Sequence, residues 1–544
     1  MADGPLIVQS DKTALLEVDH PLAADARHDL AVFAELERAP EHVHTYRITR
    51  LGLWNARAAG HDADFVLGVL DRYAKFAVPT SVRTDIAETM GRYGRLVIER
   101  DENDELILTS TAGVVLVEVT RHKKVAELLT HPRSQNAWGI APWARGQLKQ
   151  ELLKLGWPAE DLAGYAEGTP HDIALDQSGW QIRGYQTEAV DKFWNGGSGV
   201  VVLPCGAGKT IVGAAAMSVA KTNTLILVTN TVSARQWKSE LIRRTTLTEE
   251  EIGEYSGSMK EIKPVTIATY QILTTKRKSE YAHLSLLNAN DWGLVVYDEV
   301  HLLPAPIFKM TAELQARRRL GLTATLVRED GKEGDVFSLI GPKRFDAPWK
   351  EIEAQGYIAP AACFEVRIDM PEDERLSYAV SNQDERYRLA ATTDAKIAVV
   401  KKLIAKHKGE PTLIIGQYLD QIDNMAIELG APKITGETPV DEREVLFQKF
   451  RDGEVTALVV SKVANFSVDL PEASVAIQIS GSYGSRQEEA QRLGRLLRPK
   501  ADGRTAMFYT LISRDTVDQD FAQNRQRFLA EQGYSYEILD AVNL

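Results

Sequence analysis

The sequence predicts an α/β protein in which two lobes, each a parallel sheet covered by helices, follow small α+β modules. From about residue 171, short apolar runs alternate with helical segments, and these runs fall into two series. Strands that are apolar on both faces and separated by helices are typical of parallel sheets covered on both sides. The 544 residues exceed what one hydrophobic core supports and suffice for three or four domains of ~100–200 residues.

The composition excludes several classes of protein. Hydrophobic residues make up 44% of the chain and charged residues 26%, as in ordinary globular proteins. No apolar run approaches the ~20 residues that a membrane span needs, and the first ten residues lack the basic and apolar segments of a secretion signal. Two cysteines, Cys205 and Cys363, are too few for a disulfide framework or a four-cysteine zinc site. We therefore expect a cytoplasmic protein without a membrane partner.

Residues 1–110 are expected to form an N-terminal region with a winged-helix-like part. Apolar residues four positions apart predict an amphipathic helix over 81–93. Two apolar runs, 96–99 and 105–110, flank a polar turn and predict a hairpin. A helix followed by a hairpin is typical of the end of a winged helix, although many small α+β modules share this order.

A second small unit is expected over residues 111–170. It includes an apolar run at 114–117 and a helical segment at 147–155. Gly168 and Pro170 then mark a linker, because glycine and proline interrupt regular structure.

Two series of buried strands define the lobes. Lobe 1 is expected over residues 171–350 and lobe 2 over 396–544. The linker between them, 351–395, contains a polar, helix-prone insertion at 371–395. The strands expected in lobe 1 are 199–203, 224–228, 265–268, 293–297 and 320–324, and those in lobe 2 are 412–415, 456–460, 475–479 and 506–509.

The strongest motif is a glycine-rich turn that ends in Lys209 and Thr210. It lies between the strand 199–203 and a helical segment, which is the context of a phosphate-binding loop; the strict pattern has glycine in place of Leu203, and the shorter Gly-x-Gly-Lys-Thr form tolerates this. Backbone N–H groups of such a loop converge on phosphates, and the helix N-terminus adds favourable partial charge. We expect Lys209 to reach the β- and γ-phosphates of ATP and the Thr210 hydroxyl to bind Mg²⁺. The loop residues expected to bind ATP are Pro204, Cys205, Gly206, Ala207, Gly208, Lys209 and Thr210.

An acidic pair, Asp298 and Glu299, follows the apolar strand 293–297. The carboxyl ends of parallel strands form the edge at which α/β sheets bind ligands. We expect Asp298 to complete the Mg²⁺ shell and Glu299 to orient and polarise the attacking water. Such a pair is usually part of a solvated loop, but its position downstream of a phosphate-binding loop favours a catalytic role.

A third motif places basic side chains on one helical face. Gln491, Arg495 and Arg498 lie at i, i+4 and i+7, so all three project from the same side. Paired arginines on a second lobe are suited to stabilise the transition-state charge at a γ-phosphate. The alternative is a basic solvated helix, but Gly494 inside the helix favours the close approach of another surface.

These three motifs, in this order, resemble those of a superfamily 2 helicase. Residues 320–330 narrow the resemblance to XPB-type DNA repair helicases of bacteria, in which an Arg-Glu-Asp triplet closely follows a Thr-Ala-Thr motif. The likeness covers most of the chain. The other matching segments are 44–47, 53–55, 298–301, 340–343, 356–359, 461–463, 469–471, 487–498 and 526–535.

The resemblance implies two RecA-like lobes and a DNA-dependent ATPase that translocates and unwinds with 3′→5′ polarity in nucleotide excision repair. It implies a damage-recognition-like domain at 111–170 and a thumb-like insertion at about 371–395. ATP and Mg²⁺ are the implied cofactors, and forked, single-stranded or damaged duplex DNA is the implied partner. Since the net charge is −12, DNA binding must come from local basic surfaces.

We also expect a monomer that associates with the nucleoid and works with a repair nuclease. The chain lacks the long charged extensions of eukaryotic family members, so their partners do not carry over.

The resemblance assigns further residues to the nucleotide. Arg183 and Gln186 match the segment that holds adenine, and a glutamine can pair with adenine N6 and N7. A helix-capping or surface glutamine is the alternative. Asp469 and Ser461 match the motif that links the ribose to the DNA backbone.

Several residues of lobe 1 match positions at which the family grips DNA. Thr229, Gln236 and Trp237 follow the second strand and Thr269 follows the third, although Trp237 fits the core equally well. The residues expected to contact or unwind DNA are Thr229, Gln236, Thr269, Thr323, Thr325, Arg328, Glu329, Asp330 and Ser461.

Three other functions share parts of this pattern. A double-stranded DNA translocase carries the same motifs without separating long stretches of duplex. A damage-sensing module would use ATP only as a conformational switch, yet a pure switch does not need the paired arginines and the Arg-Glu-Asp triplet together. An RNA helicase is disfavoured, because Phe466 and Ser467 stand where other superfamily members have Arg-Gly.

Overall fold

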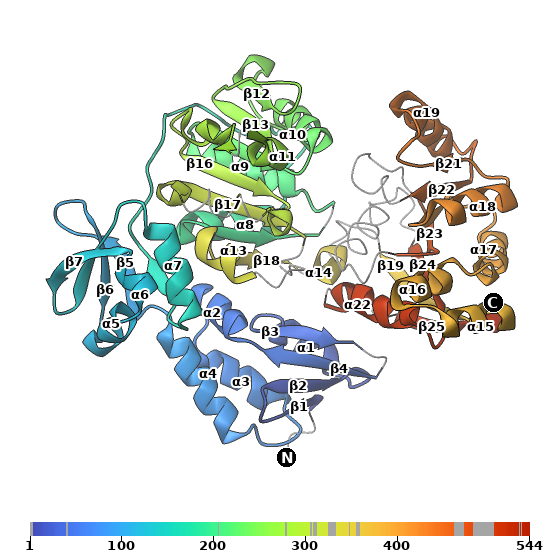
Figure 1. Ribbon diagram of the computed structural model, residues 1–544, viewed down its shortest axis with the longest axis horizontal. Coiled ribbons are helices and arrows are strands. Elements are labelled where there is room, and N and C mark those ends of the chain that lie inside the picture. Colours follow the sequence, from blue (N-terminus) through green and yellow to red (C-terminus); the bar gives the residue numbers. More distant parts are fainter. Residues whose placement is uncertain are drawn as a thin grey trace.

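The chain forms two small modules and two lobes in the computed structural model (Figure 1). Within the part of the chain described, no helix combines the length and apolarity needed to cross a membrane. The structure describes residues 4–39, 42–204, 206–277, 280–304, 307, 313–324, 333–347, 349–354, 360–461, 473–481, 505–531, 534 and 536–544.

The N-terminal module is a four-stranded antiparallel sheet of order β1-β2-β4-β3 packed against helices. The helix predicted at 81–93 is present as α4, and Ile86 and Met90 on its apolar face are buried in the core of this module. The sheet itself was not predicted. Its elements are β1 (Leu6–Val8), β2 (Thr13–Glu17), α1 (Ala23–Leu30), β3 (Ala34–Arg38), β4 (Val43–Ile48), α2 (Arg50–Ala58), α3 (Ala63–Tyr73) and α4 (Thr80–Arg92).

The second module contains the predicted hairpin, in a five-stranded sheet of order β7-β8-β6-β5-β9. The expected boundary at residue 110 is wrong, because it divides this sheet, and the hairpin does not form a winged helix with α4. Burial explains the difference: Leu108 of the hairpin shares one core with Leu148 and Leu152 of α7. The elements are β5 (Leu96–Arg100), β6 (Leu106–Ser110), α5 (Gly113–Thr120), α6 (Lys123–Ala126), β7 (Leu129–Ser134), β8 (Ala137–Ile140), α7 (Arg145–Lys154) and β9 (Ala159–Asp161).

Lobe 1 has a seven-stranded parallel sheet of order β12-β13-β11-β16-β17-β10-β18. The five predicted strands form its uninterrupted centre, and the two unpredicted strands lie at its edges. Its strands are β10 (Gly199–Val202), β11 (Thr224–Val228), β12 (Ile252–Tyr255), β13 (Val265–Thr269), β16 (Leu294–Asp298), β17 (Arg318–Thr323) and β18 (Lys343–Asp346). Its helices are α8 (Gly184–Gly196), α9 (Lys209–Ala220), α10 (Thr231–Arg244), α11 (Tyr270–Thr274), α13 (Glu333–Leu339) and α14 (Trp349–Ala354), and β14 (Lys276–Arg277) pairs with β15 (Glu280–Tyr281).

Lobe 2 repeats this architecture with a parallel sheet of order β21-β22-β20-β23-β24-β19-β25. The four predicted strands are adjacent here as well. Two helices, α15 and α16, fall in the insertion expected at 371–395. The elements are β19 (Ala361–Ile368), α15 (Glu372–Val380), α16 (Gln383–Thr392), α17 (Ala395–Lys406), β20 (Thr412–Gly416), α18 (Leu419–Leu429), β21 (Lys433–Ile434), α19 (Val440–Arg451), β22 (Ala457–Ser461), β23 (Val475–Gln478), β24 (Ala506–Ser513), α22 (Val517–Glu531) and β25 (Tyr536–Asp540).

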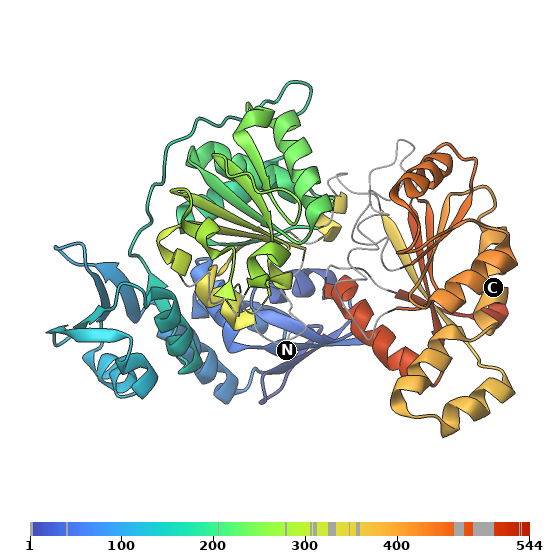
Figure 2. The same cartoon turned by 45° about the horizontal axis from the view of Figure 1, so that its top comes forward.

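The N-terminal module contacts both lobes (Figures 1 and 2). On the side of lobe 1, the backbone N–H of Lys343 donates to Asn55 Oδ1 at 2.9 Å, and Arg344 Nη1 donates to the carbonyl oxygen of Ala58 at 3.3 Å. On the side of lobe 2, α22 lies against β3, and its Ala530 is 5% exposed and belongs to the module's hydrophobic core.

A buried ion pair stabilises lobe 2. Lys396 Nζ lies 3.0 Å from Asp518 Oδ2 and also donates to the carbonyl oxygen of Ile479 at 2.8 Å, and both charged side chains are almost fully buried. Lys396→Met leaves Asp518 with an uncompensated buried charge, so we expect the free energy of unfolding of this lobe to fall by about 3–5 kcal/mol. Urea unfolding monitored by circular dichroism measures this.

The matched control for that prediction is Lys401→Met, which breaks an exposed pair with Glu428. Exposed pairs contribute about 0–1 kcal/mol, so the control should unfold at nearly the same urea concentration as the parent. Equal destabilisation by both substitutions would contradict the role assigned to Lys396.

Candidate active site

The predicted phosphate-binding loop lies between β10 and the N-terminus of α9. Gly208 has a φ of 82°, in the left-handed region that favours glycine, and caps α9. A Cβ atom there would lie 2.5 Å from Nε2 of Gln186, so the position has no room for a side chain. Leu203, which stands where the strict motif has glycine, is fully buried in the core of lobe 1, and core packing accounts for this departure.

Two residues of α8 brace the loop from behind. The carbonyl oxygen of Ala207 accepts a hydrogen bond from the Tyr185 hydroxyl at 2.7 Å and another from Gln186 Nε2 at 2.8 Å. Gln186 Oε1 accepts from the backbone N–H of Arg183 at 3.0 Å, which caps the helix. Because both ends of the Gln186 amide have partners and the residue is 1% exposed, the structure realises the helix-capping alternative; adenine contacts by Gln186 and Arg183 stay predictions.

The acidic pair meets the loop lysine at the carboxyl edge of the sheet. Lys209 Nζ lies 3.2 Å from Glu299 Oε1. Asp298, the last residue of β16, accepts a hydrogen bond at Oδ2 from Trp237 Nε1 at 2.8 Å. Glu299 has a φ of 48°, and a non-glycine residue in this region stores backbone strain of the kind often found at functional sites.

The two carboxyl groups differ in their electrostatic surroundings. Burial, and after it the neighbouring charge of Glu299, raises the pKa of Asp298 to about 6. Burial would also raise the pKa of Glu299, but Lys209 and, after it, His301 hold that pKa below its usual range. Glu299 therefore stays ionised, which a group that polarises water requires. At Asp298 the charge of Lys209 also lowers the pKa, but burial and the charge of Glu299 outweigh it.

The residues present fit a magnesium ion bound together with ATP. Asp298 and the Thr210 hydroxyl supply the hard oxygen ligands that Mg²⁺ prefers. The raised pKa of Asp298 fits as well, because a nearby divalent cation would stabilise its ionised form. Asp298 and Thr210 are thus the residues that would hold the ion.

A buried histidine connects the acidic pair to the next strand. His301 Nδ1 lies 2.5 Å from Thr323 Oγ1 and 3.5 Å from Glu299 Oε2, and its side chain is 2% exposed. Thr323 is fully buried at the end of β17. In this structure the Thr323 hydroxyl faces His301, so its contact with DNA stays a prediction.

Four other residues expected at the DNA interface differ in exposure. Gln236 is exposed on α10 and Thr229 is partly exposed at the end of β11. Thr269 is 3% exposed, and its hydroxyl accepts from the backbone N–H of Ile272 as the N-cap of α11. Ser461 is 3% exposed at the end of β22, and its buried hydroxyl has no hydrogen-bond partner among the described residues. Of these four residues, Gln236 and Thr229 are the more exposed, and the DNA contacts of all four stay predictions.

Three functional contacts were not predicted from the sequence. Trp237, which fitted either the core or DNA, is 2% exposed in the core and orients Asp298. Gly213 on α9 makes room for its ring, since a Cβ there would lie 2.5 Å from the indole. The Tyr270 hydroxyl donates to the carbonyl oxygen of Asp298 at 2.7 Å. The sequence offered one sign of further contacts around the acidic pair, because His301 follows Glu299 by two residues.

Several expected site residues lie outside the described residues, so their roles stay predictions. These are Cys205, Thr325, Arg328, Glu329, Asp330, Asp469, Gln491, Arg495 and Arg498.

Three family models match the chain. The ERCC3/RAD25/XPB C-terminal helicase model matches residues 352–543. The model of the type III restriction enzyme res subunit matches residues 180–328, which include the phosphate-binding loop and the acidic pair. The N-terminal residues 6–133 match a model described as a helicase conserved C-terminal domain.

Curated relatives match over almost the whole chain. DNA 3′-5′ helicase XPB of Kineococcus radiotolerans is 68% identical over 541 residues, which cover 99% of this chain and 97% of the relative. The Mycobacterium tuberculosis protein of the same name is 64% identical over 544 residues, covering 100% and 99%. A general transcription and DNA repair factor IIH helicase/translocase subunit XPB, from Encephalitozoon cuniculi, is 34% identical over 556 residues, covering 98% and 82%. This chain belongs to the XPB family of helicases.

Proposed function

We propose that the chain hydrolyses ATP to translocate 3′→5′ on DNA and separate its strands, in nucleotide excision repair. One observation carries the proposal: Lys209, Asp298 and Glu299 converge at the carboxyl edge of a parallel sheet, and His301 links them to the strand end that precedes the Arg-Glu-Asp triplet. Relatives that share this whole chain are named DNA 3′-5′ helicases.

The Lys209–Glu299 pair sets the order of events at the nucleotide. When ATP binds, its β- and γ-phosphates offer Lys209 a stronger partner than a single carboxylate, so the lysine leaves Glu299. Glu299 Oε2, which is buried and accepts no hydrogen bond from the described residues, then receives the attacking water. Trp237 keeps Asp298 in position by its hydrogen bond. Bound Mg²⁺ would neutralise developing phosphate charge at Asp298 and Thr210.

His301 is the coupling element in this proposal. It contacts both Glu299 and Thr323, so a shift of Glu299 on hydrolysis would move His301 and, through it, Thr323 at the end of β17. The chain continues from there into the segment with Thr325, Arg328, Glu329 and Asp330. The proposal assigns that segment to DNA, with Arg328 on a phosphate.

Lobe 2 completes the catalytic set. Arg495 and Arg498, with Gln491 on the same helical face, reach the γ-phosphate when the lobes close and stabilise the transition state. The working form is a cytoplasmic, nucleoid-associated monomer whose substrate is forked, single-stranded or damaged duplex DNA, and a repair nuclease is its protein partner.

Two displacement assays with the purified full chain test the function. Strand displacement from a duplex with a 3′ overhang reports unwinding, and triplex displacement reports translocation on duplex. We expect both, together with ATPase activity that DNA stimulates and RNA does not. Triplex displacement without unwinding would establish a double-stranded DNA translocase instead, and low turnover even in excess DNA would establish a damage-sensing switch.

The Arg328-Glu329-Asp330 triplet should separate unwinding from hydrolysis. With all three residues replaced by alanine, we expect DNA-stimulated ATPase to stay largely intact while strand separation on a forked substrate fails, because the charges that divide the strands are gone. Both activities are measured on the same fork. A parallel loss would assign the triplet to the ATP site or the fold, and no loss would make it a simple turn.

A further inference from the structure

A cavity of about 420 Å³ lies where the N-terminal module, the second module and lobe 1 meet. Arg57 lines it from the N-terminal module, Lys149 and Asp161 from the second module, and Arg319 and Arg344 from lobe 1. Its volume falls in the range of small-molecule sites. None of these residues belongs to the nucleotide site, so the cavity is separate from that site.

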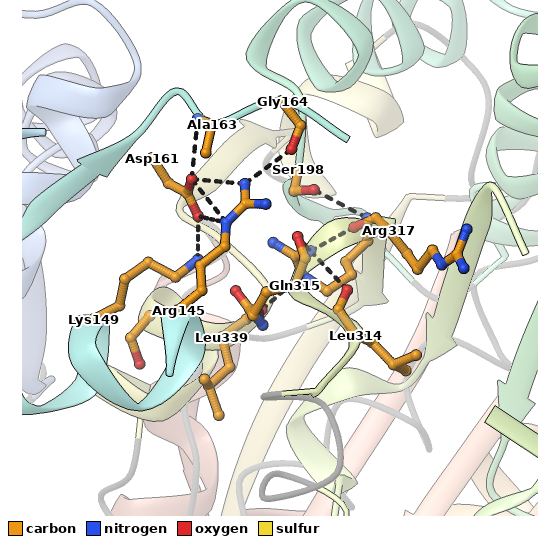
Figure 3. Close-up of polar contacts among 12 residues, drawn as sticks. Arg145, Lys149, Asp161, Ala163, Gly164, Ser198, Leu314, Gln315, Arg317 and Leu339 are labelled. Atoms are coloured by element: carbon orange, nitrogen blue, oxygen red, sulfur yellow. Dashed lines mark hydrogen bonds and ion pairs between the residues drawn. The ribbon is translucent and has the colours of Figure 1, made fainter. Parts of the chain in front are cut away.

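Asp161 is shared by two buried cations beside this cavity (Figure 3). Its carboxylate accepts hydrogen bonds from Arg145 Nη2 at 2.7 Å and from Lys149 Nζ at 2.7 Å. Arg145 is 3% exposed and Lys149 is 7% exposed. One carboxylate thus faces two cations, which leaves the cluster with an excess of positive charge.

Arg319 adds a third buried cation. It is 1% exposed, and its guanidinium donates to the carbonyl oxygens of Leu314, Gln315 and Leu339 at 3.1, 2.8 and 2.8 Å. Carbonyl oxygens satisfy its hydrogen bonds but carry no net charge. Among the residues that the structure describes, no carboxylate forms an ion pair with Arg319. A buried charge without a counter-charge is costly, so the junction lacks a neutralising group.

Arg344 and Arg57 complete the lining. Arg344 is also held by carbonyl oxygens, and its Nε donates to the carbonyl oxygen of Ser198 at 2.9 Å. Arg57 lines the cavity and is exposed to solvent. Four cationic side chains therefore line the cavity, and Glu160 and Asp161 are the two carboxylates that do. The excess of positive charge affects Lys149. Burial, together with the charges of Arg319 and Arg145, lowers the pKa of Lys149 to about 8, although Asp161 acts in the opposite direction.

We propose that this cavity binds a phosphate group through Arg57, with Lys149 and Arg319 supplying the surrounding positive charge. Phosphate is small, carries up to two negative charges and offers several acceptor oxygens, which match a guanidinium donor pair. Bound at this junction, it would offset up to two units of the excess positive charge and hold the second module against lobe 1. The group could be free phosphate or part of a DNA strand; the chemistry is the same.

Calorimetric titration with inorganic phosphate tests the proposal. The titration uses the full chain carrying Lys209→Ala, so that the phosphate-binding loop does not contribute, at constant ionic strength set by chloride. We expect one phosphate to bind, and Arg57→Ala to weaken it about tenfold, the lower end of the effect of a hydrogen bond between charged groups. The matched control, Arg72→Ala, removes an exposed arginine of α3 that does not line the cavity and should leave the affinity unchanged.

A second variant of the cavity lining distinguishes loss of phosphate binding from loss of the fold. Lys149→Met removes a lining cation and leaves Arg145 paired with Asp161, and its melting temperature reports whether the fold survives. If phosphate binds equally well to Arg57→Ala and Arg72→Ala, or produces no binding heat at millimolar concentration, the proposal is overturned.

Competition identifies the source of the phosphate. A single-stranded oligonucleotide is added to the phosphate-loaded protein with and without a 5′-phosphate. If the oligonucleotide displaces phosphate from the parent chain but not from Arg57→Ala, DNA is the source of the phosphate group. If the oligonucleotide displaces no phosphate, the ligand is the free anion. Both outcomes support the site, and neither depends on ATP turnover.

Discussion

Lys209→Ala is expected to abolish ATP hydrolysis, with a loss of ~10³-fold or more in kcat. The substitution removes the flexible cation that binds the β- and γ-phosphates. It also removes one of the two neighbouring charges that hold the pKa of Glu299 below its usual range in the nucleotide-free chain; His301 is the other and remains. The loss of the phosphate contact is therefore the effect that stops hydrolysis. Phosphate release in the presence of saturating forked DNA measures the effect.

The control for this prediction is Lys192→Ala, which removes an exposed lysine on α8 paired with Glu188. It should hydrolyse ATP at the parental rate. If Lys209→Ala retains more than about a tenth of the parental kcat, the loop lysine does not have the role that its position between β10 and α9 assigns to it.

Glu299→Gln is expected to keep nucleotide affinity and stop turnover. The amide preserves the shape of the side chain but is a poor proton acceptor, so the water is no longer polarised. Asp298 and Thr210 remain to bind Mg²⁺. Lys209 loses its carboxylate partner in this variant, so the phosphates of ATP do not have to displace Glu299 from the lysine. The affinity for ATP should therefore equal or exceed that of the parent.

Equilibrium binding of a fluorescent ATP analogue, followed by single-turnover hydrolysis with forked DNA, separates the two effects. Glu188→Gln, on the exposed face of α8, is the neutral comparison. Turnover of Glu299→Gln at a near-parental rate would show that another group activates the water.

The centres of both sheets were predictable from sequence because their strands are buried on both faces. β11 has the bounds predicted, 224–228, and all five of its residues are buried. Edge strands carry no such signal: β25 (Tyr536–Asp540) has no buried residue, and β12 includes Gly253 and the partly exposed Glu254. The N-terminal sheet was missed because its strands are only three to six residues long, and β3 and β4 carry polar and charged residues among their apolar ones.

The candidate catalytic residues could be named from the sequence where a motif is local, and the groups that contact them could not. Lys209 and Glu299 each lie in a short pattern that implies its own chemistry. Trp237 reaches Asp298 across 61 residues of sequence, and that contact exists only because β11 and β16 are neighbours in the sheet. Pattern alone gives no order of strands. Tyr185 and Tyr270 support the site through single hydroxyl contacts that leave no trace in spacing.

The N-terminal module is attached to both lobes, and this limits how the distance between the lobes can change. A single folded body fixes the span between Lys343 of lobe 1 and Ala530 of lobe 2. The lobes therefore cannot approach each other by bending the linker alone. A change in the distance between the lobes has to alter the seat of Ala530 in the module's apolar core or the hydrogen bond between Lys343 and Asn55. The N-terminal module therefore adds to the free energy that any change in lobe spacing requires, without contributing a residue to the nucleotide site.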